Sequence, residues 1–276
     1  MKDMHYVLAN FFTHKDFLAD PELIPGTLFT PLHFVFAAFF ITFLIASACF
    51  TARRKKLIKP VVVSVWAVMV LWEILIFWWD STAGIHKGPN FLIDLPLYPC
   101  SLYLYTVPFM IWGKGRIRQS ACGYLCTLGL LGSVLNLILP MARLLDYSCI
   151  SFAGLHTLSF HGAMFFTYLV LMRSGWHRYD QVSSLTDLLL PCIPSLIQSI
   201  PSNILNYTIG SDYMYFRGEF PAVRFIFRNT DPILITLSLY ILYILVPALF
   251  YLPAYLHRRR HAGEEDMVSI FHTRFS

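Results

Sequence analysis

Long apolar stretches recur along the chain, and they constrain its fold more than any other feature. A helix that spans a bilayer needs about 20 mostly apolar residues, because lipid cannot hydrogen-bond free backbone groups. Seven stretches reach or approach this length, which predicts an all-α polytopic membrane protein with seven transmembrane helices. They are Pro31–Phe50, Pro60–Trp79, Leu95–Trp112, Gln119–Leu139, Ser151–Met172, Ser184–Tyr207 and Pro232–Tyr255.

The composition fits a chain whose main solvent is lipid. Hydrophobic residues make up 57% of the 276 residues and charged residues 13%, whereas typical globular domains carry about 25% charged residues. A compact soluble domain has too little interior to bury this much apolar surface. The composition therefore excludes a disordered chain, a fibrous repeat and a nucleic-acid module, and we expect no nucleic acid among the partners.

The basic residues predict an orientation. If seven spans alternate, fourteen of the 21 lysines and arginines fall on one side, and the positive-inside rule makes that side cytoplasmic. The N-terminus is then outside and the C-terminus inside, in a multi-pass protein that we expect in the cell membrane. The fourteen are Arg53, Arg54, Lys55, Lys56, Lys59, Lys114, Arg116, Arg118, Arg173, Arg178, Arg258, Arg259, Arg260 and Arg274.

The chain divides into three parts around these spans. Residues 1–30 are predicted to form an N-terminal interfacial segment, with a short amphipathic helix over His5–Leu18. Residues 31–256 are predicted to form one seven-helix transmembrane domain. Residues 257–276 are predicted to form a basic cytoplasmic tail, in which His257–His261 (HRRRH) favours anionic lipid.

The cysteines do not form the pattern of a disulfide framework or a metal site. Five of the six lie within predicted spans, and only Cys149 lies near a loop. Cys122 and Cys126 share a helix face, but no histidine or carboxylate accompanies them on that helix. No Gly-rich phosphate loop is present either. We therefore expect neither a metal nor a cofactor.

Polar side chains lie inside several spans, where an ionisable group costs about 2.5–3.5 kcal/mol on insertion scales. In the predicted orientation they share the outer half of the bilayer. They are Glu73, Asn136, His156, His161, Asn203 and Asn206, together with Asp94, Tyr98, Ser101 and Tyr105 on one face at the start of the third span. One interpretation is a polar cavity open toward the outer leaflet. The other is a hydrogen-bond network that only joins helices.

Cys100 is the candidate nucleophile. It lies in the sequence LPLYPCSL at residues 95–102. Proline favours the first helical position, so Pro99 predicts that Cys100 lies in the first turn of a helix. Free N–H groups and the positive end of the helix dipole favour a thiolate there, and the same N–H groups suit an oxyanion. The alternative is a small apolar core residue.

His161 is the candidate base that partners this cysteine. It shares a helix face with Gly154 and Thr157, and small residues let helices approach closely. Cys100 and His161 enter from the same side at depths that differ by about one helical turn, and Cys–His is a recognised nucleophile–base pair. His156 points to a different face and is the reserve candidate. The alternative is a histidine bonded only to a backbone carbonyl.

Four segments together resemble the YwaF-like integral membrane family, which includes the eukaryotic transmembrane protein 164. The segments are LPLYPCSLYLY (95–105), GYLCTLGLLGSVLN (123–136), SFHGAMFF (159–166) and NYTIGSDYMYF (206–216). The resemblance implies a lipid acyltransferase, in which a cysteine takes an acyl chain from a phospholipid as a thioester and a lysophospholipid accepts it. Carried across, the catalytic residues are Cys100 and His161, and the Asn-Tyr pair is Asn206 and Tyr207. Many members have His-Leu before the cysteine, where this chain has Tyr98 and Pro99.

The leading hypothesis is therefore acyl transfer between membrane phospholipids and lysophospholipids by Cys100 and His161. Substrate-binding or orienting roles are expected for Glu73 and Asn136 near the imidazole or head group, for Asn206 and Tyr207 on the acceptor side, and for Tyr98, Ser101 and His156. A carrier or channel for a small polar solute is the second hypothesis, because proline interrupts the third and sixth spans. A non-catalytic membrane interaction protein is the third.

Overall fold

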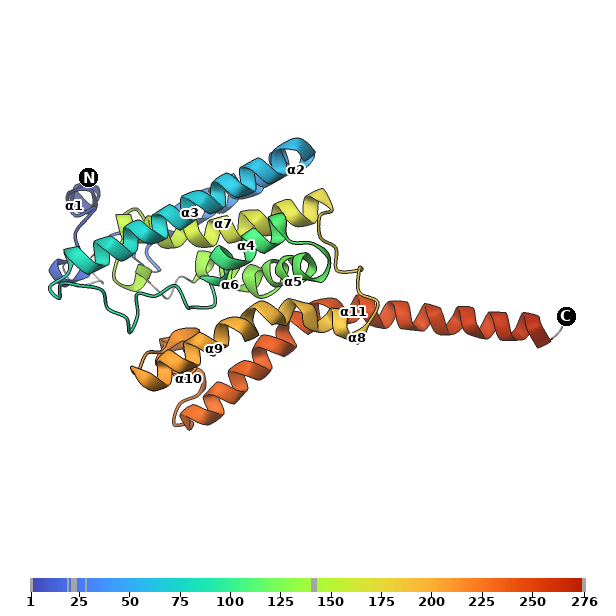
Figure 1. Ribbon diagram of the computed structural model, residues 1–276. Helices are drawn as coiled ribbons and strands as arrows, with labels where there is room; N and C mark the ends of the chain where they lie inside the picture. Colours follow the sequence, from blue (N-terminus) through green and yellow to red (C-terminus); the bar gives the residue numbers. More distant parts are fainter. Residues whose placement is uncertain (1, 19, 21–23, 28, 140–142, 275–276) are drawn as a thin grey trace.

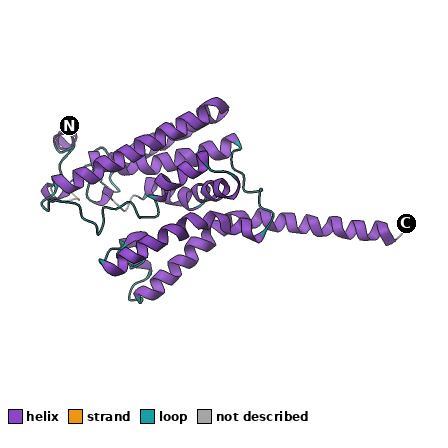
Figure 2. Ribbon diagram, viewed as in Figure 1, coloured by secondary structure: helices purple, strands orange, loops and turns teal. Residues whose placement is uncertain are grey.

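The computed structural model of the chain describes residues 2–18, 20, 24–27, 29–139 and 143–274. Figure 2 shows that this part of the chain is built from helices and loops, without a strand. The predicted all-α class is confirmed. In these ranges six helices are long and apolar enough to cross a membrane. They are α2 (Pro31–Arg53), α3 (Lys55–Ala83), the pair α5 (Gly115–Cys126) and α6 (Leu128–Ile138), α7 (Phe152–Ser174), the unit Leu185–Thr208, and α11 (Pro232–Arg274) over Pro232–Arg259.

The predicted third span differs from this set. Its helix α4 runs only from Leu102 to Trp112, which is about 16 Å at the helical rise and too short to cross alone. The preceding residues 95–101 form turns instead. Pro96 and Pro99 cause this, because each disfavours helical geometry in the residue before it. The count of seven spans therefore stays a prediction.

Two other spans are interrupted. Helices α5 and α6 are separated at Thr127, whose backbone leaves the helical region (φ −123°, ψ −91°) and whose hydroxyl donates to the Gly123 carbonyl 2.8 Å away. The sixth predicted span consists of α8 (Leu185–Leu189), η4 (Leu190–Cys192) and α9 (Ile193–Thr208). This second break lies at prolines, which lack the N–H that a continuous helix needs.

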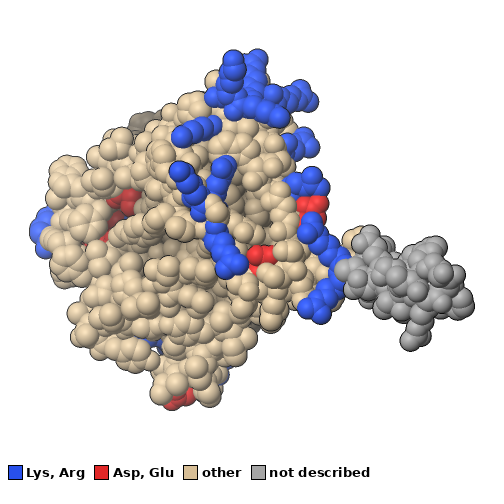
Figure 3. All heavy atoms as spheres, turned by 45° about the vertical axis from the view of Figure 1, so that its right-hand side comes forward, with Lys and Arg blue, Asp and Glu red and all other residues tan. Residues whose placement is uncertain are grey.

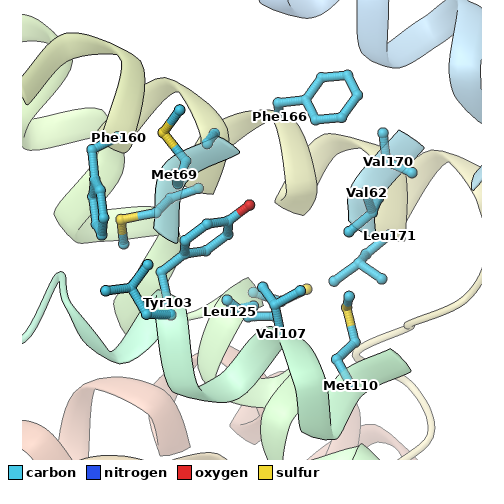
Figure 4. Close-up of a cluster of buried hydrophobic side chains, with 14 of the residues drawn as sticks. Val62, Met69, Tyr103, Val107, Met110, Leu125, Phe160, Phe166, Val170 and Leu171 are labelled. Atoms are coloured by element: carbon cyan, nitrogen blue, oxygen red, sulfur yellow. The ribbon is translucent and has the colours of Figure 1, made fainter. Parts of the chain in front are cut away.

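Helix α7 forms the centre of the larger helix group. It packs against α2, α3, α5 and α6, and Figure 1 shows it beneath α2 and α3 and above α6. Gly162 permits the close approach of α2, since a Cβ there would lie 2.6 Å from the Phe40 ring. In Figure 4, Tyr103 of α4 reaches into this core, near Phe160 and Met69. Side chains on α7 are thus held inside the bundle.

The N-terminal segment differs from the helix predicted over His5–Leu18. Helix α1 covers Lys2–Ala9, and a short 3-10 turn, η1, covers Lys15–Phe17. Side chains hold the part between them, because the Trp79 indole N–H donates to the Phe12 carbonyl at 3.1 Å. At the other terminus, α11 continues as one helix through Arg274 and extends beyond the bundle (Figure 1).

Lysine and arginine side chains gather at one end of the bundle, which we call the basic end. Figure 3 shows them along the right-hand side of that view. The basic end includes the α2–α3 connection (53–59), the α4–α5 connection (114–118) and the end of α7. Helix α1 lies at the opposite end (Figure 1). The N-outside orientation stays a prediction, with this asymmetry as its support.

Candidate functional site

One ring nitrogen of His161 has no hydrogen-bond partner among the residues that the structure describes. Its Nδ1 lies 2.8 Å from the Thr157 carbonyl oxygen in the preceding turn of α7. A carbonyl only accepts hydrogen bonds, so Nδ1 carries the proton and Nε2 holds a lone pair. Within the described residues Nε2 is buried without a hydrogen-bond partner. The local helix thus fixes the tautomer that a general base requires.

Cys100 lies on an irregular segment whose carbonyl groups are bonded by side chains. The Tyr124 hydroxyl donates to the Pro99 carbonyl, and the Gln198 amide donates to the Tyr98 carbonyl at 2.8 Å. The hydroxyl of Tyr105 donates to the Pro96 carbonyl at 3.1 Å. Non-helical backbone survives at membrane depth only where the protein satisfies its polar groups. These bonds therefore allow a turn to carry a half-buried thiol into the bundle.

The expected place of Cys100 within its helix was wrong by one turn. Helix α4 begins at Leu102 with Ser101 as its N-cap residue, so Cys100 precedes the helix rather than lying in its first turn. The cause is again the pair of prolines at 96 and 99. Ser101, which follows the thiol, is buried, and its backbone N–H donates to the Tyr98 carbonyl at 3.0 Å.

The contacts of Tyr103 with α7 bear on the relative level of Cys100 and His161. Helices α4 and α7 both run toward the basic end (Figure 1). Tyr103 contacts α7 through the Phe160 ring, 5.9 Å between centroids, and through the Thr167 hydroxyl at 3.2 Å. Cys100 precedes Tyr103 by about one turn, which corresponds to the level of Phe160 and His161.

Glu73 connects these groups electrostatically. Its carboxylate accepts a hydrogen bond from His156 Nε2 at 2.9 Å, and it acts electrostatically on both Cys100 and His161. The Trp72 ring meets the His156 ring edge to face at 5.9 Å. Among the described side chains, Trp72 Nε1 and His156 Nδ1 are buried without partners. Glu73 and Trp72 of α3 and His156 of α7 thus form one polar region.

Tyr98 and Asn206 both contact the loop that follows α9. The Tyr98 ring lies 5.3 Å from Tyr213 and 5.5 Å from Tyr215, between centroids. Asn206 donates to the Tyr213 carbonyl and accepts from the Tyr213 N–H and the Ser211 hydroxyl. Asn206 therefore shapes the loop that carries Tyr213 and Tyr215.

Two predicted residues lie apart from the others. Tyr207 is 72% exposed and faces away from the bundle. Asn136 donates to the Gly132 carbonyl of its own helix at 2.9 Å, and within the described ranges no hydrogen bond joins it to Glu73 or the histidines. The side chains of Asn206 and Tyr207 thus lie in different environments, although the two residues are adjacent in the sequence.

Several residues at the site were missed by sequence reasoning. The Tyr124 hydroxyl bonds the Pro99 carbonyl, Gln198 bonds the Tyr98 carbonyl, and the Tyr215 ring contacts the Tyr98 ring. Gln198 had a detectable signal, because a carboxamide inside a span needs a partner. The tyrosines had none, since aromatic residues are common throughout this chain.

The described residues include no cluster of three or more histidine, cysteine or acidic side chains that could hold a metal. Cys122 and Cys126 are buried free thiols.

A sequence model of the TMEM164 family matches residues 28–256, which includes all four segments of the resemblance. The chain belongs to the TMEM164 family. No curated protein and no solved structure matches it. Family membership and the six apolar helices make it a multi-pass membrane protein. The Cys100 segment and the His161 helix both lie in the part that the TMEM164 family shares.

Proposed function

We propose that this protein is a membrane acyltransferase that moves an acyl chain between phospholipids and lysophospholipids through a Cys100 thioester. The observation that carries the proposal is the unpartnered Nε2 of His161, fixed as a proton acceptor by the bond from Nδ1 to Thr157. On this proposal it takes the proton of the half-buried Cys100 thiol, which lies on the irregular segment before α4.

The first half-reaction makes the thioester. His161 Nε2 accepts the thiol proton of Cys100, and the sulfur attacks the ester carbonyl carbon of a phospholipid. The C–O bond then breaks, and the leaving lysophospholipid oxygen takes the proton from the imidazolium. In this step the backbone N–H of Cys100 stabilises the oxyanion.

The second half-reaction reverses these roles. The hydroxyl of an acceptor lysophospholipid gives its proton to Nε2 and attacks the thioester carbonyl. The C–S bond breaks, and the Cys100 sulfur recovers the proton. Glu73 supports both halves because its negative charge stabilises the imidazolium that forms each time. His156 holds Glu73 in place through the 2.9 Å bond.

Intact mass of the purified protein after incubation with a labelled phospholipid tests this proposal. We expect wild type to gain the mass of one acyl chain and to lose it when lysophospholipid is added. Cys100→Ala should gain none. Cys49→Ala is the matched control, because Cys49 is also half-buried but lies at the basic end. No adduct on wild type, or an equal adduct on Cys100→Ala, rejects the proposal.

A carrier for a small polar solute is the second candidate, favoured by the backbone break at Thr127 within the α5–α6 span. Solute uptake into liposomes that persists in Cys100→Ala would support it. A non-catalytic interaction protein would show neither uptake nor adduct.

A further inference from the structure

A cavity of about 460 Å³ lies outside the cysteine–histidine region. It is formed by the loop after α9, the short helix α10 (Pro221–Ile226) and the start of α11. Figure 1 shows these elements at the end of the bundle opposite the basic end. Because α9 ends and α11 begins there, the cavity lies where two spans reach the membrane surface.

Arginines dominate the lining of this cavity. Arg217, Arg224 and Arg228 all line it, and among the described residues that line it Glu219 alone is acidic. Arg217 lies 4.0 Å from Glu219, whereas the described residues pair neither Arg224 nor Arg228 with a carboxylate. The cavity is therefore positively charged. Guanidinium groups of this kind match the oxygens of a phosphate by forked hydrogen bonds.

A second observation identifies the source of that phosphate. Phe225 and Ile226, on the same short helix as Arg224, are 85% and 73% exposed. Apolar side chains this exposed at the end of a spanning bundle enter the acyl region of the membrane, while neighbouring arginines stay at head-group level. A phosphate that reaches this cavity is thus part of a lipid.

The cavity is also joined to the Cys100 region by one loop. Asp212 accepts hydrogen bonds from the backbone N–H groups of Arg217, Glu219 and Phe220. Tyr215, two residues before Arg217, contacts Tyr98. Two residues span at most about 8 Å between Cα atoms. A lipid held by its phosphate in this cavity thus keeps its ester groups near the loop that borders Cys100.

From these contacts we infer that the Arg217–Arg224–Arg228 cavity binds the phosphate of a glycerophospholipid whose chains lie beside Phe225 and Ile226. The site deepens the proposed function, and it rests on that function only for the use made of the bound lipid.

Native mass spectrometry of the full chain in detergent tests this site, with every arm in the Cys100→Ala background so that no acyl transfer occurs. The probes are dioleoylphosphatidylcholine and dioleoylglycerol, which share both chains and differ in the phosphate head group. We expect the phospholipid to bind at least tenfold more tightly. Equal affinities would overturn the proposal.

The double variant Arg224→Gln with Arg228→Gln tests whether the arginines bind the phosphate. This variant should weaken phospholipid binding by about tenfold for each arginine and leave dioleoylglycerol unchanged, since a charged hydrogen bond contributes about 1.5–3 kcal/mol. The matched control is Lys55→Gln with Lys56→Gln, which removes two exposed cations at the basic end and should change nothing. Unchanged binding in the arginine variant, or an equal loss in the control, contradicts the site.

Two further arms complete the experiment. Where the glutamine variant does not fold, Arg224→Lys with Arg228→Lys replaces it, keeping the charge but losing the forked geometry, and should bind about tenfold more weakly. Glycerol 3-phosphate at millimolar concentration should not displace the phospholipid; displacement would assign the cavity to a soluble phosphate and overturn the lipid. The thioester test needs wild-type Cys100, whereas the binding test is done without it. A failure of the lipid site can therefore be told apart from a failure of the proposed acyl transfer.

Discussion

Cys100 lies on an irregular segment whose carbonyls are bonded by side chains from α4, α5 and α9, whereas His161 lies on a regular helix that supplies its own partner. The cysteine depends on residues far away in the chain, since Gln198 is 100 positions from Tyr98. The histidine depends on a carbonyl four positions away. One group is thus positioned by tertiary contacts and the other by local helix geometry.

This difference has a chemical consequence. The bond from His161 Nδ1 to the Thr157 carbonyl forms wherever α7 is helical. Substitutions elsewhere in the chain should therefore leave the tautomer of His161 unchanged. The turn at Cys100 persists only while its carbonyls keep their donors, because an unpaired polar group in a membrane interior is costly. Substitutions distant from the site should therefore disturb the cysteine more than the histidine.

The largest effect is expected for His161→Asn. The asparagine amide can still donate to the Thr157 carbonyl, but it has no counterpart of the Nε2 lone pair. Thioester formation should slow by about 10²–10⁴-fold, the usual contribution of a general base, with little change in thermal unfolding. The rate is measured by intact mass in a single turnover. An adduct that forms at the wild-type rate would show that His161 is only structural.

Tyr124→Phe should act on the cysteine side of the comparison. It leaves the Pro99 carbonyl without its donor, which costs about 1–3 kcal/mol of stability, and it loosens the turn at Cys100. Alkylation of Cys100, measured by peptide mass mapping, should become faster.

The matched control for this prediction is Tyr179→Phe. Its hydroxyl donates to the Cys126 carbonyl at the α5–α6 break, so stability should fall by a similar amount while alkylation of Cys100 stays unchanged. Equal acceleration in both variants would mean that general loosening, and not the bond to Pro99, controls the thiol.

The helix of His161 could be predicted because its rules are local. The Ser151 hydroxyl accepts from the Gly154 N–H and caps the helix, and apolar residues continue from there to a C-terminal Gly175 in the left-handed region. The boundary of the Cys100 helix could not be predicted in this way. Pro99 fits a first helical position equally well, and only the distant donors Tyr124 and Gln198 select the turn.

The Asn-Tyr pair shows a second limit. Adjacent helical residues point about 100° apart, so Asn206 enters the buried loop while Tyr207 faces outward. A motif places both residues in one region of the chain, but only packing decides which of them reaches the site.

Glu73→Gln should act through the histidine, because the Glu73 carboxylate stabilises the imidazolium that His161 forms when it takes the thiol proton. The amide oxygen still accepts from His156, but the negative charge is lost. We expect thioester formation to slow about tenfold, equivalent to about 1.4 kcal/mol. Asp146→Asn, which removes a carboxylate paired with Lys15 at 3.7 Å, is the charge-matched control. A wild-type rate in Glu73→Gln would remove Glu73 from the mechanism.

The smallest effect concerns Asp16, which holds another non-helical segment from outside the spans. The Ile85 N–H donates to its carboxylate at 2.9 Å, and this bond lowers the pKa of Asp16 below its usual 3.8. Because the folded pKa is lowered, the stabilisation is complete above the unfolded pKa and is lost as pH falls through the folded pKa. Hydrogen-exchange protection of the Ile85 amide should therefore decline below about pH 4. Asp16→Asn should reduce that protection severalfold at pH 7, since a neutral amide accepts more weakly than a carboxylate. Full protection in Asp16→Asn would show that exposed turns, unlike the turn at Cys100, do not depend on their side-chain partners.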